Sequence, residues 1–199
     1  MFSATRPVLV WATFALLTSA AASAVEVNGV TVAERIQIGP SGPNLVLNGA
    51  GVRKRLIFKI YVAALYLPAK MNSGEEILRD DQPRRLQLHM LRDLTSKELS
   101  ASMIETLNAT LTPAERSPLE SRVRQFNAIL ETLRDVRLGT QIAIDYVPQF
   151  GTAVLVDGYE KGRIPGADFN QALLRMWIGA RPRDVELRTA LLGVRPGSK

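Results

Sequence analysis

The spacing of apolar residues along the chain changes several times, and each change predicts a structural element. From Val25 to Gly39, apolar and polar residues alternate on both sides of Asn28-Gly29, a pair typical of a two-residue β-hairpin turn. From Leu56 to Leu67, apolar residues fall on both faces of a period-two reading, and Pro68 ends the run. A strand that is apolar on both faces is covered on both sides, so we expect residues 56–67 in the centre of a sheet.

A second alternating segment, residues 84–91, predicts another strand. Leu86, Leu88 and Met90 fall on one face, whereas Gln87 and His89 share the semi-polar face. Before the central run, the sequence LVLNGAG (residues 45–51) predicts a short strand and a turn, because glycine is common where the chain bends sharply.

The middle of the chain has helical spacing. Residues 95–98 fit a capping box, and Leu99, Met103, Leu107 and Leu111 follow at helical intervals. Residues 112–115 fit a second capping box, with proline at the first helical position. Gly139 is the expected end of this second helix. We expect two antiparallel helices, or one helix broken near Pro113, lying against the sheet.

Strand patterns resume at residues 140–148 and 152–159, joined as a hairpin at residues 149–151, and a short strand is expected at 162–164. Two further helices are expected at residues 167–179 and 183–193, each ending at a glycine. Adjacent hairpins with helices grouped to one side predict an α+β domain: one antiparallel sheet packed against a layer of helices.

The first 24 residues have the pattern of a secretory signal peptide. Arg6 supplies the positive charge, residues 7–20 the apolar run, and Ala22-Ser23-Ala24 a small-residue cleavage site. An anchoring helix is the alternative, but the apolar run is short for a membrane span. The sequence therefore predicts a domain over residues 25–199 in a periplasmic or secreted protein, with no stable membrane span after cleavage.

Composition excludes several classes of function. The net charge is +6, but the cations are scattered and no basic block is interleaved with aromatic residues, which argues against nucleic acid as a partner. The chain has no cysteine, so thiol catalysis and cysteine–metal sites are excluded. A single histidine, His89, argues against a multi-histidine metal site and against a Ser-His-Asp triad. We expect no cofactor and no metal ion.

A candidate anion site lies at the start of the central run. Arg53 follows the glycines of residues 49–52, and its planar guanidinium suits a carboxylate, phenolate or enolate. Lys59 and Tyr61 are two residues apart, so we expect them on the same strand face, where a cation and a phenol could bind one anionic oxygen. The alternative is a solvated turn, with Lys59 paired to an acid.

His89 admits two interpretations. On the semi-polar face of its strand it could ligate a haem iron or carry protons. Alternatively, it is simply hydrogen-bonded at the surface of the sheet.

Two segments resemble the chalcone isomerase family in its bacterial, exported branch. They are LNGAGVRKRLIFKIYVAALYLP (residues 47–68) and DFNQALLRMWIGARPRDVELRTALLG (residues 168–193). The resemblance implies an antiparallel sheet with a helical layer and a ligand cleft between them. It also implies that Arg53 matches the arginine that holds the anionic oxygen of the substrate in plant chalcone isomerases.

The same resemblance locates other site residues. Tyr61 stands where the isomerases have a threonine that polarises the substrate ketone, and Thr95 and Ser102 match a tyrosine and an asparagine of those enzymes. An arginine with a tyrosine resembles the non-catalytic, fatty-acid-binding branch, in which both side chains hold a carboxylate. The first expectation is therefore a binding protein for a fatty acid or similar apolar carboxylate. The expected ligand-binding residues are Arg53, Tyr61, Lys59, Thr95, Leu99, Ser102 and Met103.

Two alternatives remain open at this point. One is an intramolecular lyase that closes a chalcone-like enone, with Arg53 and Tyr61 as the catalytic residues. The other is haem binding that involves His89 and Arg53, since other relatives of the fold are described as haem binders.

Overall fold

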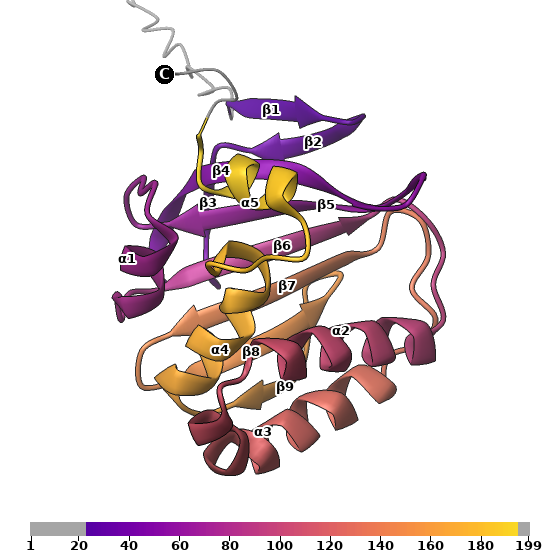
Figure 1. Ribbon diagram of the computed structural model, residues 1–199. Helices are drawn as coiled ribbons and strands as arrows, with labels where there is room; N and C mark the ends of the chain where they lie inside the picture. Colours follow the sequence, from indigo (N-terminus) through magenta and orange to yellow (C-terminus); the bar gives the residue numbers. More distant parts are fainter. Residues whose placement is uncertain (1–22, 195–199) are drawn as a thin grey trace, which may run out of the picture.

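A seven-stranded antiparallel sheet in the order β3-β4-β5-β6-β7-β8-β9 organises the chain, and a separate hairpin, β1-β2, lies beside it (Figure 1). The structure is a computed structural model and describes residues 23–194. The strands are β1 (Ala24–Val27), β2 (Val30–Ala33), β3 (Arg35–Gln37), β4 (Asn44–Arg55), β5 (Phe58–Leu67), β6 (Arg84–Met90), β7 (Gln141–Val147), β8 (Gly151–Val156) and β9 (Tyr159–Ile164). The helices are α1 (Gly74–Arg79), α2 (Ser96–Thr110), α3 (Pro113–Glu131), α4 (Ala167–Ile178) and α5 (Val185–Leu191).

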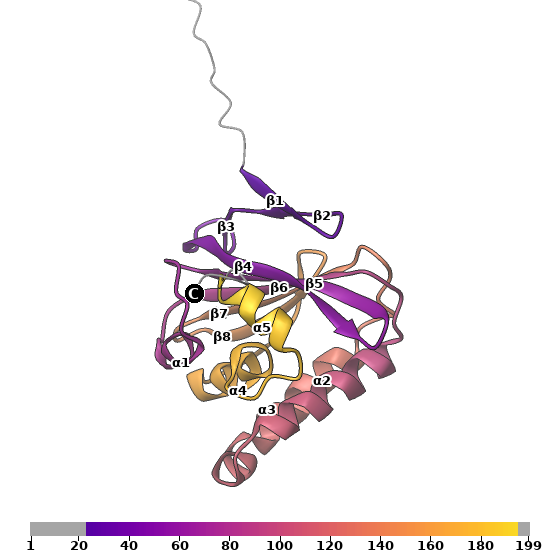
Figure 2. The same ribbon diagram turned by 45° about the horizontal axis from the view of Figure 1, so that its top comes forward.

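The two faces of the sheet are covered differently. The helices lie on one face, over a large apolar core, and the β1-β2 hairpin lies on the other (Figure 2). Alternate residues of β5 serve the two sides, because Ala63 and Leu65 pack into the helical core while Val62 and Ala64 pack under the hairpin. The expected α+β fold is confirmed, and so is the expectation that the long apolar run is central and covered on both faces.

Most elements lie where the sequence pattern predicts them. Asn28 and Gly29 form the β1-β2 turn, and Leu86, Leu88 and Met90 all point into the helical core. The predicted end of the helix that begins at residues 112–115 is wrong, since this helix, α3, ends at Glu131 and not at Gly139. The chain turns back after Glu131 because Val136 pairs with Leu94, and Gly139 occupies the turn before β7 with φ +88°.

The prediction of a turn at residues 45–51 is also wrong. These residues belong to the twelve-residue strand β4, and the turn to β5 is formed instead by Leu56 and Ile57. The glycines serve packing, because α5 lies directly against this strand. A Cβ atom on Gly49 would lie 2.0 Å from the carbonyl oxygen of Ala190, and one on Gly51 would lie 2.7 Å from the Ala190 Cβ.

Asn48 holds the C-terminal end of α5 against β4. Its Nδ2 donates to the carbonyl oxygen of Leu191 at 2.7 Å, and its Oδ1 accepts from the backbone N–H of Met71 at 2.7 Å. Asn48 is also the extra residue of a β-bulge, since Leu47 pairs with Tyr66 and Gly49 pairs with Leu65. The bulge reverses the alternation of β4, so that Gly49, Gly51 and Arg53 face the helices.

The expected signal peptide falls almost entirely on residues outside the described range; of residues 1–24, only Ser23 and Ala24 are described. Within residues 23–194, no helix combines the length and the apolar character needed to cross a membrane.

Replacing Gly49 by alanine tests the packing of α5. We expect the free energy of unfolding to fall by about 3 kcal/mol, because backbone, and not a flexible side chain, occupies the space that the new methyl group needs. Gly158→Ala is the comparison, since Gly158 has φ +83° but nothing within 4 Å of its Cβ position, and we expect a loss of about 1 kcal/mol. Urea denaturation followed by circular dichroism measures both values. Equal losses would contradict the interpretation of Gly49 as a packing residue.

Candidate ligand-binding site

A cavity of about 550 Å³ lies between the helical layer and the β4-β5 hairpin. Its walls come from the hairpin, from α2, from the end of α4 and from the start of α5. The volume falls within the range of about 300–1,000 Å³ typical of small-molecule sites. The expected cleft between sheet and helices is therefore present, at the end of the sheet where β4 turns into β5.

A second β-bulge determines which side chains of the hairpin face this cavity. Arg53 pairs with Tyr61 and Lys54 pairs with Lys59, so Ile60 is an extra residue in β5. Both Ile60 and Tyr61 line the cavity. Lys59 is exposed and donates to the side-chain oxygen of Asn28, in the hairpin on the opposite face. The expectation that Lys59 and Tyr61 share a face was wrong, because the bulge interrupts the period-two alternation.

Arg53 lines the cavity with part of its guanidinium unused. Its Nη1 donates to the side chain of Asp184 at 3.2 Å and to the carbonyl oxygen of Lys54 at 3.1 Å. Within residues 23–194, its Nε and Nη2 have no hydrogen-bond partner. These two nitrogens form one edge of the planar fork, and that edge suits a carboxylate in bidentate contact.

Asp184 holds Arg53 in place. The carboxylate caps α5 by accepting from the backbone N–H of Leu187 at 2.9 Å, and it also accepts from the backbone N–H of Lys54 at 3.3 Å. Burial acts to raise the pKa of Asp184, but these two backbone hydrogen bonds and Arg53 together bring its pKa below the ordinary value. Asp184 is therefore ionised at neutral pH and joins the start of α5 to the end of β4.

Tyr61 presents a phenol beside Arg53. The two residues are direct cross-strand partners, and Tyr61 is almost completely buried. Its oxygen accepts a hydrogen bond from the indole Nε1 of Trp177 at 3.0 Å. Burial raises the pKa of Tyr61 above its ordinary value, and the bond from Trp177 and the charge of Arg53 only partly oppose this effect. The phenol stays protonated at neutral pH, so it can accept from Trp177 and donate its own proton to a ligand.

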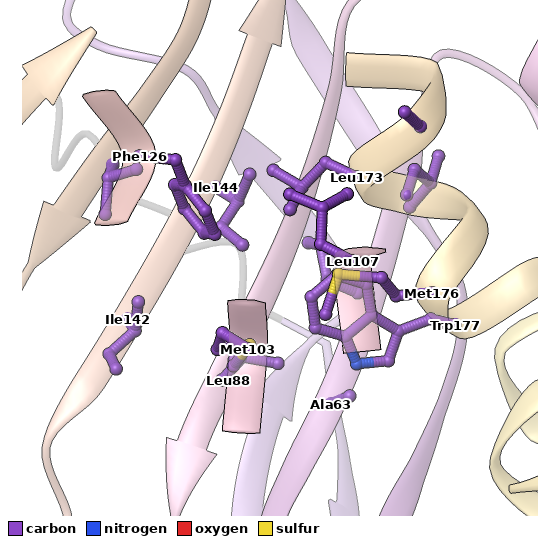
Figure 3. Close-up of a cluster of buried hydrophobic side chains, with 14 of the residues drawn as sticks. Ala63, Leu88, Met103, Leu107, Phe126, Ile142, Ile144, Leu173, Met176 and Trp177 are labelled. Carbon is purple, nitrogen blue, oxygen red and sulfur yellow. The ribbon is translucent and has the colours of Figure 1, made fainter. Parts of the chain in front are cut away.

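Buried apolar side chains form another part of the cavity lining. Leu99 and Met103 contribute from α2, one helical turn apart, and Met176 and Trp177 contribute from α4. Figure 3 shows Met176 and Trp177 reaching from their helix toward the strand that carries Ala63. A chain of methylene groups placed here would be removed from water.

The two glutamates of the lining already have partners. Glu105 accepts from Arg183 at 2.7 Å, and Glu98 accepts from the backbone N–H of Thr95 at 2.9 Å. Hydrogen bonds from these partners lower the pKa of both glutamates, so both are ionised. An anionic ligand is therefore best placed away from them, at the unused edge of Arg53.

The sequence-predicted residues divide between the cavity and other positions. Five of the seven line it: Arg53, Tyr61, Leu99, Ser102 and Met103. Ser102 is exposed and contributes to the lining from α2. Thr95 does not line the cavity; its side chain caps α2 by accepting from the backbone N–H of Glu98 at 3.1 Å. Lys59 is the other residue outside the lining.

His89 lies on a different face from the cavity. It pairs with Val62 in β5, whose side chain packs under the β1-β2 hairpin, whereas the neighbouring Met90 points into the helical core. Burial lowers the pKa of His89, so the imidazole is neutral at neutral pH. Within the described residues, no group of three histidine, cysteine, aspartate or glutamate side chains is placed to hold a metal ion. His89 and Arg53 therefore do not share one site.

Sequence reasoning missed two residues of the site. Trp177 is predicted above only as part of a helix, and Asp184 only as the second residue of the last one. The sequence holds a signal for Asp184, because an aspartate three residues before Leu187 at the start of a helix is typical of an N-cap. No local pattern indicates that the indole of Trp177 reaches Tyr61, since 116 positions separate the two residues.

Comparisons with known proteins agree with this architecture. A search of curated proteins found no match. Among solved structures, the chain is similar to the fatty-acid binding protein of Arabidopsis thaliana, with a TM-score of 0.61 and 16% sequence identity. The similarity covers 80% of this chain and 96% of the plant protein, and at that identity it shows a shared fold. The model of the chalcone isomerase-like family matches residues 24–193. The chain therefore belongs to the chalcone isomerase-like family.

Proposed function

We propose that this protein binds a fatty acid or a similar apolar carboxylate without transforming it. One observation carries the proposal: a partly free guanidinium and a buried, protonated phenol are cross-strand neighbours in the lining of a cavity that also contains buried apolar side chains. The carboxylate would lie against Nε and Nη2 of Arg53 and accept the proton of Tyr61. The hydrocarbon chain would lie along Leu99, Met103 and Met176.

The fixed geometry of the two polar groups supports binding. Arg53 is held by Asp184, and Tyr61 by Trp177, so neither side chain needs to be ordered when a ligand arrives. The shared fold with a plant fatty-acid binding protein makes a fatty acid the first ligand to test.

Replacing Arg53 by glutamine tests the anion contact. We expect the affinity for octanoate to fall about 10- to 100-fold, because a charge-assisted pair of hydrogen bonds contributes about 1.5–3 kcal/mol. Isothermal titration calorimetry on delipidated protein measures the dissociation constants. Lys59→Gln is the matched control, since it removes one cation from the same hairpin but on the opposite face, and its affinity should equal that of the original protein. An unchanged affinity in Arg53→Gln would refute the proposed head-group site.

The pH dependence of binding tests the role of Tyr61. Because its pKa is raised above the ordinary value of about 10, the phenol is protonated throughout the range from about pH 7 to 9 and donates equally well. We expect octanoate affinity to be constant over this range. Tyr61→Phe should bind about three- to tenfold more weakly at every pH, because one hydrogen bond is lost while the ring remains. If the octanoate affinity of the original protein fell toward that of Tyr61→Phe as the pH rises, Tyr61 would be ionising in this range.

We propose further that the protein acts outside the cytoplasm after removal of residues 1–24. The support is the sequence pattern alone, a charged start, an apolar run and Ala22-Ser23-Ala24. N-terminal sequencing of the protein purified from its host should begin at Val25. A chain that retains residues 1–24 would contradict cleavage.

A further inference from the structure

The turn between β4 and β5 is the most exposed apolar segment among the described residues. Leu56 is 90% exposed, Ile57 is 88% exposed and the next residue, Phe58, is 52% exposed. No packing inside the domain accounts for the identity of Leu56 and Ile57, and three consecutive apolar residues at a hairpin tip are unusual for a surface in water.

Two other hairpins of the same protein show what such a turn ordinarily contains. The two-residue turns of β1-β2 and β8-β9 are Asn28-Gly29 and Asp157-Gly158, residue types that tolerate positive φ. In the β4-β5 turn, Leu56 adopts φ +54°, a conformation that leucine rarely takes. The backbone conformation therefore does not explain the apolar turn, which indicates selection for contact with something outside the domain.

Cations surround this apolar tip. Residues 53–59, with the sequence RKRLIFK, contain four cations and no acid. The Arg92 guanidinium lies over the ring of Phe58, 5.0 Å from its centroid. Lys54 pairs with Glu186, whereas Arg55 has no ion pair within the described residues. An apolar turn flanked by cations is complementary to a bilayer with anionic head groups. The cations can contact lipid phosphates while the apolar side chains enter the boundary of the acyl chains.

We propose that the β4-β5 hairpin docks this protein on the surface of an anionic lipid bilayer. A protein partner fits less well, because three residues at a narrow tip offer too little area for a stable protein interface. Leu56 and Phe58 also line the cavity and are 90% and 52% exposed, so docking would bring this part of the cavity lining against the lipid. This consequence rests on the proposed function: a fatty acid could pass between bilayer and cavity without crossing water.

Co-sedimentation with vesicles tests the docking. We expect the full-length mature protein to bind vesicles of phosphatidylcholine mixed with phosphatidylglycerol, to bind pure phosphatidylcholine more weakly, and to be released by salt. Ile57→Ser should reduce binding to the mixed vesicles about tenfold, because it removes the most exposed apolar residue outside the cavity lining. Phe150→Ser is the matched control. Phe150 is 67% exposed at the β7-β8 turn, at the other end of the sheet, and its loss should leave vesicle binding unchanged.

The outcomes separate docking from ligand binding. Octanoate affinity in solution should be the same in Ile57→Ser as in the original protein, because Ile57 does not line the cavity. Protein that fails to bind octanoate but binds mixed vesicles through Ile57 would refute the proposed function and retain the docking. The docking proposal would be overturned if the original protein bound no vesicles, or if the Ile57→Ser variant bound them as well as the original protein does. A protein partner would then be the explanation of the apolar turn.

Discussion

The close approach of α5 to β4 is the constraint on which the site depends. The helix can lie on the strand only because Gly49 and Gly51 have no side chain there, and Asn48 fixes its far end through the carbonyl oxygen of Leu191. Its near end is then positioned so that Asp184 reaches β4. One carboxylate thus caps a helix, satisfies a strand N–H and orients Arg53. The glycine-rich motif acts on the ligand site indirectly, by admitting the helix that holds the arginine.

The chemical character of the cavity follows from the way its two polar groups are supported. Each is held by a different helix, Arg53 by Asp184 at the start of α5 and Tyr61 by Trp177 at the end of α4. A protonated phenol whose oxygen already accepts from an indole is well suited to donate and poorly suited to act as a base. A fixed guanidinium edge recognises a planar anion better than a spherical one. Both properties favour holding a carboxylate.

The sequence predicted the fold well because the relevant signals are local. Capping boxes at Thr95 and Thr112, Asn28-Gly29 and the double-sided apolar run each depend on a few neighbouring residues. Arg53 and Tyr61 were found through their sequence motif. The errors arose where distant packing decides the outcome. The glycines of β4 were read as a turn because α5 is 140 residues away, and the contact of Trp177 with Tyr61 left no local trace.

The β-bulge at Ile60 has a consequence for how this hairpin can change over time. On a regular strand, a substitution changes a side chain but not the face of the sheet on which that side chain lies. In β5, the extra residue Ile60 determines on which face Lys59 lies relative to Tyr61. If Ile60 were paired regularly with Lys54, the pleat would run unbroken, Lys59 would share the face of Tyr61 and a second cation would enter the cavity. The pairing register at this point therefore determines ligand preference as directly as the identity of any residue. A relative with the same residues but no bulge in this hairpin would carry a different binding site on the same fold.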